Sequence, residues 1–158
     1  MPSDDTPRCH AEAAVDLPLD PQSAWDAAMD WNRQSEWMLF TRVWATGNEG
    51  RGVGGGVAAR TSVGPLGFTD DMVITHWDPP RECTVKHLGT IVRGAGTFAI
   101  HPATTSPGDA APRSTFVWFE DVIPPLGRLG RAAWPVIRPG FELMMRISLN
   151  RLAKAVAR

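Results

Sequence analysis

The segment FELMMRISLNRLAKAV, residues 141–156, decides the fold, because its apolar side chains recur at helical spacing. One apolar stripe with three- and four-residue steps runs through this segment and the residues before it, formed by Trp134, Ile137, Phe141, Met144, Met145, Ser148, Leu152 and Val156. Pro135 and Pro139 each remove a backbone donor and crowd the preceding turn. We therefore predict a C-terminal helix that starts or kinks at one of these prolines and is straight from about residue 140 to about 157.

The N-terminal part predicts one strand followed by two short helices. Residues 1–7 are polar and contain proline, so we expect a flexible leader. The alternation of apolar and polar residues over His10–Leu19 is typical of a strand. Asp20 and Pro21 combine an acidic cap with proline at the first helical position, which marks a helix start. A second short helix is expected through residues 35–37.

The central part predicts only strands. Short runs rich in Val, Thr, Ile, Phe and Trp alternate with turns that contain Gly, Pro and Asn. These runs place strands near residues 42–48, 54–63, 67–77, 83–89, 93–101 and 114–122, with a loop at 103–112. The Gly-rich stretch 50–56 is interpreted as a turn, because it lacks the GKS or GKT ending of a phosphate-binding loop. The expected class is α+β, with a seven-stranded antiparallel sheet whose open face the long terminal helix must cover.

Length and charge indicate one domain inside the cell with no polyanionic partner. The 158 residues suffice for a single domain, which we expect at 8–158. With 16 basic and 17 acidic side chains, the formal net charge is -1, so nucleic acid is not an expected partner. No apolar run reaches the ~20 residues that cross a bilayer, so we expect a cytoplasmic protein with no integral membrane association. Cys9 and Cys83 lack metal-site or disulfide spacing, which favours reduced thiols, and a homodimer is left open.

Several short motifs stand in the order found in a known superfamily. They are Asp20-Pro21 with Trp25, Asp30-Trp31, Trp37, Gly52-Val53-Gly54, Gly64-Pro65-Leu66-Gly67-Phe68, Trp77-Asp78-Pro79-Pro80-Arg81, Arg93-Gly94, Phe98, Pro102, the run 116–122 and Pro124-Pro125-Leu126-Gly127. Over residues 8–157 the sequence resembles the SRPBCC (START/Bet v 1-like) superfamily, in its polyketide cyclase/dehydrase-like branch. The resemblance implies the helix-grip fold and a central cavity. It does not choose among the carriers, receptors and aromatase/cyclases that the superfamily includes.

The side chains expected to line a pocket follow from strand alternation. Seven Trp, six Phe and six Met supply bulky groups that either fill a core or line an adaptable pocket. We take the more apolar parity of each strand as its inward face. The ligand-binding residues expected on that face and on the terminal helix are Phe68, Asp70, Met72, Ile74, His76, Val85, Phe98, Ile100, Phe116, Trp118, Phe141, Met144, Met145 and Ser148. Gly94 and Gly96 lack side chains and leave room for a ligand or a bend.

Four ionisable residues fall on this expected inward face, namely Asp70, His76, His87 and Glu120. A carboxylate beside an imidazole in an apolar pocket orients a ligand hydroxyl or carbonyl, or moves protons. The alternative is that these side chains lie at the rim of the sheet and bond to solvent, a loop or the backbone. A metal site built on His76 and His87 lacks a third ligand, so we expect neither a metal nor a cofactor.

Three functions compete at this point. The favoured one is a binder of a small hydrophobic molecule such as a lipid or a polyketide, held in the central cavity. The second is a cyclase, aromatase or dehydratase in which His87 and Glu120 are the catalytic acid and base. The third is an interaction module that regulates a partner protein, which a filled core and an exposed apolar patch would favour.

Overall fold

The computed structural model describes residues 6–104, 106–108 and 111–158, and its elements follow in the predicted order. They are β1 (Cys9–Leu17), α1 (Pro21–Ala28), α2 (Trp31–Trp37), β2 (Thr41–Gly47), the short 3-10 helix η1 (Asn48–Gly50), β3 (Gly56–Val63), β4 (Leu66–Asp78), β5 (Glu82–His87), β6 (Arg93–Pro102), β7 (Ser114–Ile123) and α3 (Arg128–Val156). Residues 1–5 of the expected leader and residues 105, 109 and 110 of the expected loop lie outside the described residues.

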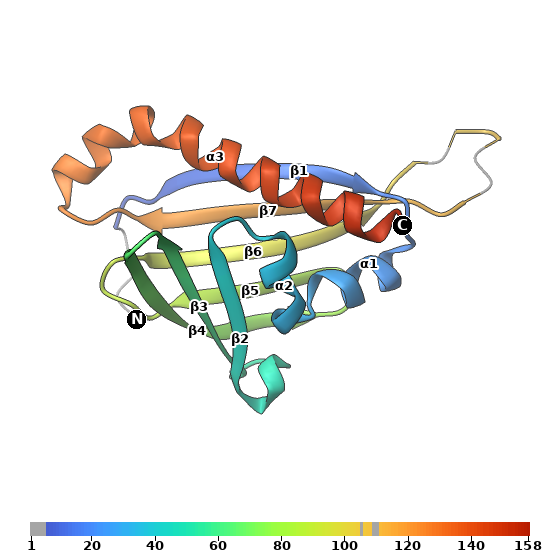
Figure 1. Ribbon diagram of the computed structural model, residues 1–158, viewed down its shortest axis with the longest axis horizontal. Helices are drawn as coiled ribbons and strands as arrows, with labels where there is room; N and C mark the ends of the chain where they lie inside the picture. The colour runs from blue at the N-terminus through green and yellow to red at the C-terminus, as the bar shows by residue number, and fades with distance from the viewer. Residues whose placement is uncertain (1–5, 105, 109–110) are drawn as a thin grey trace.

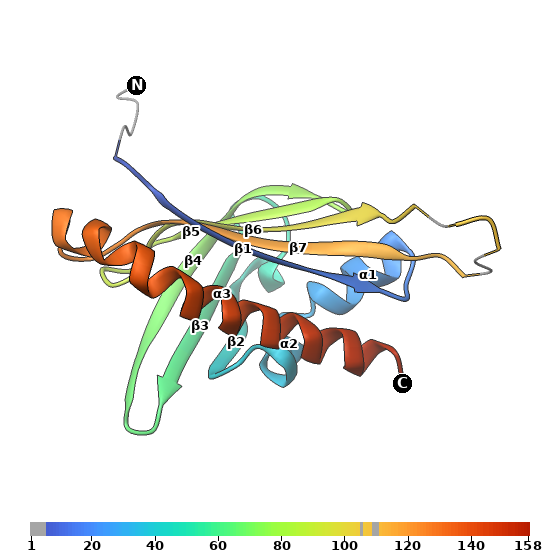
Figure 2. The same cartoon turned by 90° about the horizontal axis from the view of Figure 1, so that it is seen from above.

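The seven strands form one antiparallel sheet in the order β1-β7-β6-β5-β4-β3-β2. Figure 1 shows α3 extending along the sheet beside β1, and Figure 2 shows all three helices on one side of it. The strands β2, β3 and β4 curl toward that same side, so the sheet is concave where the helices lie (Figure 2). The predicted α+β helix-grip fold is confirmed. None of the described helices combines the length and apolarity needed to cross a membrane.

The two short helices form where the sequence supplies caps and an apolar face. The Asp20 side chain accepts hydrogen bonds from the backbone N–H groups of the first turn of α1, and Pro21 is the first helical residue. The Asp30 side chain caps α2 in the same way. The buried faces of these helices, which pack toward the concave side of the sheet, consist of Ala24, Trp25, Ala28, Trp31, Gln34 and Trp37.

The terminal helix differs from the prediction at its start. α3 begins at Arg128, ahead of both prolines, so of the two predicted alternatives, a start or a kink at a proline, the start is wrong. Both prolines and the residues between them are exposed, and water can therefore hydrate the carbonyls that lose a helical partner. Figure 1 shows that α3 curves in this first part and runs straighter toward the C-terminus.

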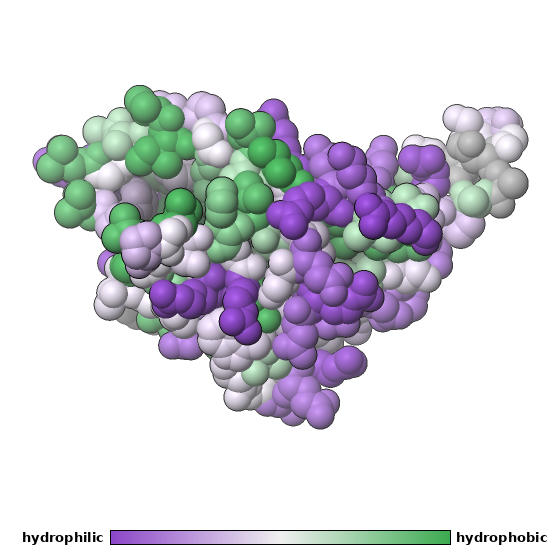
Figure 3. Space-filling view, in the orientation of Figure 1, coloured by the Kyte–Doolittle hydropathy of each residue, from purple (hydrophilic) through white to green (hydrophobic). Residues whose placement is uncertain are grey.

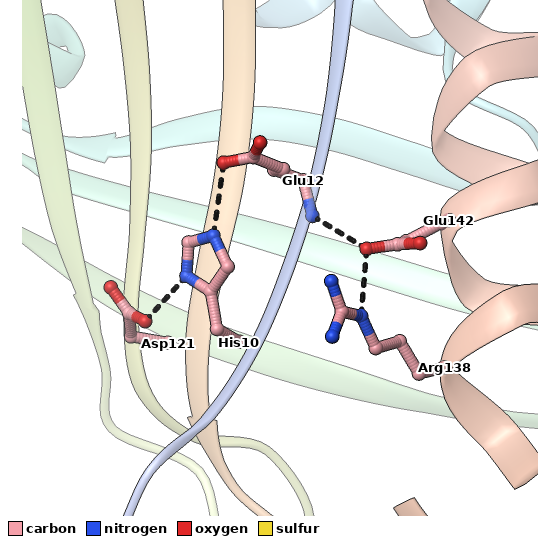
Figure 4. Close-up of polar contacts among 5 residues, drawn as sticks. All are labelled: His10, Glu12, Asp121, Arg138 and Glu142. Atoms are coloured by element: carbon pink, nitrogen blue, oxygen red, sulfur yellow. Dashed lines mark hydrogen bonds and ion pairs between the residues drawn. The ribbon is translucent and has the colours of Figure 1, made fainter. Parts of the chain in front are cut away.

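A polar network joins α3 to the edge strand β1 (Figure 4). The Glu142 carboxylate accepts from the backbone N–H of Glu12 at 3.2 Å and from Nε of Arg138 at 2.9 Å. On the strand side, His10 bonds to Asp121 at 2.8 Å and to Glu12 at 3.0 Å. One backbone N–H on the free edge of β1 is thus satisfied by a side chain of α3.

Candidate functional site

A cavity of about 330 Å³ lies between the concave face of the sheet, α2 and α3. Ten of the residues predicted from strand alternation and helix periodicity line it: Phe68, Asp70, Met72, Val85, His87, Phe98, Trp118, Glu120, Phe141 and Met144. Gly96, singled out for its missing side chain, is also part of the wall. The curved sheet and the terminal helix therefore enclose a space that their side chains do not fill.

Some wall residues were not predicted, and most of them come from α2, β2 and β3. They are Trp31, Gln34, Met38, Thr41, Val43, Ala59, Thr61 and Val92. Strand parity could have identified Ala59 and Thr61, because they share the inward parity of β3 with the fully buried Val57. The residues of α2 line the cavity because this helix lies over the sheet, and no local sequence pattern predicts that position.

Five residues predicted to bind the ligand are instead part of the packed core. They are Ile74, Ile100, Phe116, Met145 and Ser148, each buried and none on the cavity wall. Phe116 packs edge-on against Trp37, with ring centroids 6.3 Å apart. The Ser148 hydroxyl bonds to the backbone of Leu39 and Met144. The three strand residues Ile74, Ile100 and Phe116 point to the predicted side of the sheet, but α1, α2 and the second half of α3 cover that end of the sheet.

His76 is the one predicted site residue that faces away from the cavity. The register of β4 shifts between Ile74 and His76, which pair with Val85 and Thr84, so Thr75 is an extra residue. Such a bulge reverses the alternation beyond it. Trp77 consequently takes the inward position, and the His76 side chain is 54% exposed at 3.9 Å from Glu82.

The polar part of the cavity wall is a chain of four bonded side chains. Nδ1 of His87 lies 2.5 Å from Oδ2 of Asp70, and Nε2 of His87 lies 3.0 Å from Oε2 of Glu120. The other oxygen of Glu120 accepts from the indole N–H of Trp118 at 2.8 Å. Asp70, His87 and Glu120 are all buried, and they come from β4, β5 and β7. Three strands therefore bring two carboxylates and one imidazole together.

Gly96 of β6 makes this meeting possible. β6 lies between β5 and β7, with Gly94 opposite His87 and Gly96 opposite Glu120. A Cβ on Gly96 would lie 2.7 Å from Oε1 of Glu120, inside the space that the carboxylate occupies. The imidazole and the carboxylate thus reach each other across a strand that carries no side chain at these positions.

The protonation of His87 reflects two opposing effects. Burial favours the neutral imidazole, but the hydrogen bonds and charges of Asp70 and Glu120 outweigh it and raise the pKa of His87 to about 9. His87 is therefore an imidazolium at neutral pH, bonded to an acceptor on each ring nitrogen. Oδ1 of Asp70 is buried and has no hydrogen-bond partner. This arrangement offers a ligand negative oxygen atoms, and it holds a proton between two bases.

One end of the cavity adjoins an apolar surface. A smaller hollow of about 190 Å³ shares Val92, Val122 and Phe141 with the cavity wall, and Ile91 and Trp134 also line it. Figure 3 shows apolar side chains gathered over the first half of α3, at the upper left. The exposed apolar residues of this region are Leu126, Leu129, Val136 and Ile137. The cavity wall at this end is therefore continuous with an apolar part of the surface.

Comparisons with known proteins identify the family and the fold. The family model described as polyketide cyclase/dehydrase and lipid transport matches residues 8–157. Among solved structures, the Zhui aromatase/cyclase from Streptomyces sp. R1128 superposes with a TM-score of 0.72 at 18% identity, covering 96% of this chain and 94% of that one. The XoxI protein from Bacillus cereus gives a TM-score of 0.69 at 14% identity, covering 94% and 96%. No curated protein matched the chain.

Proposed function

Because the chain belongs to the polyketide cyclase/dehydrase and lipid transport family, we propose that it binds one small hydrophobic molecule in the cavity between sheet and α3. The observation that carries the proposal is the cavity itself, whose wall is mostly apolar and whose ionisable residues are Asp70, His87 and Glu120. Residues 8–158 form the proposed ligand-binding domain. A filled core would have favoured the interaction module instead.

The size and chemistry of the wall support binding without a cofactor. Aromatic rings of Trp31, Phe98 and Trp118 face the space, and Met72 and Met144 add flexible side chains that adapt to different shapes. Burying an apolar guest there contributes about 25 cal/mol for each Å² removed from water. A few polar groups then fix the orientation of the guest.

The test uses N-phenyl-1-naphthylamine, a neutral apolar fluorophore. We expect a saturable rise in its fluorescence with one site per chain. Ala59→Phe places a ring into the cavity from the wall of β3 and should weaken binding at least about tenfold. The control is Val63→Phe, which adds the same ring at an exposed position of the same strand. Equal binding by both variants, with both folded by circular dichroism, would contradict the proposal.

A second candidate function is favoured by the position of His87 and Glu120 on the cavity wall. A buried imidazole bonded to two carboxylates can pass a proton to or from a bound guest. In an aldol-type cyclisation, Glu120 would take a proton from a carbon between two carbonyls, and that carbon would attack a third carbonyl. The new alkoxide would then take a proton from His87, and loss of water would follow. Proton transfer of this kind contributes about 10²–10⁴-fold to a rate.

The enzymatic candidate is tested with a synthetic linear poly-β-ketone thioester. Mass spectrometry of the products should show a cyclised species that has lost water, formed faster than in buffer. Glu120→Gln should abolish this excess rate while it retains binding of N-phenyl-1-naphthylamine. A wild-type rate equal to that of buffer would leave the binding function as the conclusion.

A further inference from the structure

The charges on the cavity wall indicate which molecules it accepts. Among the described residues that line the cavity, the ionisable ones are Asp70, His87 and Glu120, and neither lysine nor arginine is present. Two carboxylates and one imidazolium leave a net negative charge at the polar end of an apolar space. A ligand that ends in a carboxylate would bring a second negative charge next to this group, with no cation to receive it.

Most hydrogen-bond donors of the wall already have protein acceptors. The Thr41 hydroxyl donates to the carbonyl of Leu39 at 3.1 Å, and the Thr61 hydroxyl lies 3.2 Å from the Thr41 hydroxyl. The indole N–H of Trp31 donates to the carbonyl of Gly50 at 2.7 Å, and the amide of Gln34 donates to the carbonyl of Ala28 at 2.8 Å. The indole of Trp118 donates to Glu120, and both nitrogens of His87 face carboxylates. An anionic group needs several such donors, and here most are committed to protein oxygens, which leaves the second N–H of the Gln34 amide.

Acceptors, in contrast, remain available. Each ionised carboxylate has about four acceptor sites. Oδ1 of Asp70 is buried without any partner, and each oxygen of Glu120 accepts one bond. Oδ1 of Asp70 is closed to solvent, whereas the Glu120 side chain lines the cavity and is 10% exposed, so a donor on the ligand can use the remaining acceptor sites of Glu120. The wall is therefore rich in acceptors and poor in free donors.

Resting on the proposed function, we infer that the cavity selects a neutral apolar molecule that brings its own O–H or N–H donor to Glu120, and that it excludes carboxylate-terminated molecules such as free fatty acids. The class that fits is an apolar ring system or chain carrying an alcohol, a phenol or a neutral amine. Glu120 acts as the selecting group, because its oxygens lie on the wall opposite the side-chain-free Gly96.

The test compares three molecules of nearly equal size by isothermal titration calorimetry at pH 6. These are 2-naphthol with a donor, 2-methoxynaphthalene without one, and 2-naphthoate with a negative charge. We expect 2-naphthol to bind at least about threefold more tightly than the ether and at least about tenfold more tightly than the carboxylate. Glu120→Gln keeps the shape of the side chain and removes its charge, and should reduce the disadvantage of 2-naphthoate at least about threefold. Glu82→Gln, which removes a carboxylate outside the cavity, should leave all three affinities unchanged.

The possible failures are distinguishable. Binding of 2-naphthoate as tight as that of 2-naphthol would overturn the inference and leave the proposed binding function standing. The inference would also fall if N-phenyl-1-naphthylamine binds and 2-naphthol does not. Absence of binding by every apolar probe, the fluorophore included, would overturn the proposed function itself.

Discussion

At the scale of single residues, Gly96 determines whether the buried polar group can form. The position opposite Glu120 carries no side chain, and the carboxylate occupies the space where a Cβ would be. Glu120 is held from two further sides by His87 and Trp118, so it cannot move away without losing a hydrogen bond. A methyl group on residue 96 would therefore push the Glu120 carboxylate out of its place and weaken its hydrogen bonds to His87 and Trp118.

We predict that Gly96→Ala lowers the free energy of unfolding by about 1–3 kcal/mol. Gly96 does not have a positive φ, so the cost comes from the displaced carboxylate and not from backbone strain. Urea denaturation measures the change. The control Gly140→Ala, in α3 with no atom within 4 Å of the new Cβ, should be neutral or stabilising. In a Glu120→Ala background the cost of Gly96→Ala should shrink, and an unchanged cost would contradict this account.

The raised pKa of His87 leads us to predict that the stability of the protein depends on pH. Its pKa is raised from 6.5 in the unfolded chain to about 9 in the folded protein, so its stabilising contribution is complete below pH 6.5 and is lost as the pH rises through 9. Between pH 6 and pH 9 the free energy of unfolding should fall by roughly 3 kcal/mol because of this group. Denaturation curves at several pH values measure the slope.

Two substitutions distinguish the contributions of His87 and His10 to this pH dependence. Glu120→Gln lowers the pKa of His87 toward its ordinary value, because one of its two carboxylate partners is gone, and should flatten the slope. Glu12→Gln is the matched control. It removes a contact of exposed His10, whose pKa is raised by Asp121 and then by Glu12, and it leaves the buried group intact. If Glu12→Gln flattens the slope more than Glu120→Gln does, the assignment of the pH dependence to His87 is contradicted.

At the scale of elements, Trp31 joins α2 to the short helix η1. Its indole N–H donates to the carbonyl of Gly50, and the ring lines both the cavity and a separate, more polar hollow of about 340 Å³. A Cβ on Gly50 would lie 2.4 Å from Nε1 of Trp31. The position of α2 over the sheet therefore depends on the absence of a side chain at Gly50.

We predict that Gly50→Ala destabilises the protein by at least about 2 kcal/mol more than Gly52→Ala does. Both glycines have a positive φ, +66° and +70°, so alanine strains the backbone similarly at the two sites. Only Gly50 touches the indole, since the nearest atom to a Cβ on Gly52 is 3.9 Å away. Thermal unfolding and the tryptophan fluorescence of both variants measure the difference. Equal destabilisation would show that the indole contact is unimportant.

At the scale of the whole molecule, binding and stability are coupled through the cavity. A guest that binds only the folded chain adds about 2.7 kcal/mol to the free energy of unfolding at a hundredfold excess over its Kd. For a chain of this size, 2-naphthol at that excess should raise the Tm by about 5–10 °C. Ala59→Phe should abolish the shift, whereas Val63→Phe should retain it. A similar shift in both variants would place the binding site elsewhere.

The sequence by itself determined the order of the elements and the inward parity of most strands. Asp20 and Pro21 start α1 through local contacts, and alternation alone directs Asp70, His87 and Glu120 inward. These are properties of short segments, so they can be recognised without knowing what packs against them. For the same reason the helical stripe of α3 could be recognised, although the two prolines left its start undecided and the structure places it at Arg128.

Only the tertiary structure decided which inward residues line the cavity and which fill the core. Phe98 and Phe116 point to the same side of the sheet, but Phe98 lines the cavity, whereas Phe116 is fully buried against Trp37 of α2. The bulge that turns His76 outward is a single extra residue without a sequence signature. The convergence of Asp70, His87 and Glu120 depends on the register of four strands, and register is a long-range property that local patterns do not contain.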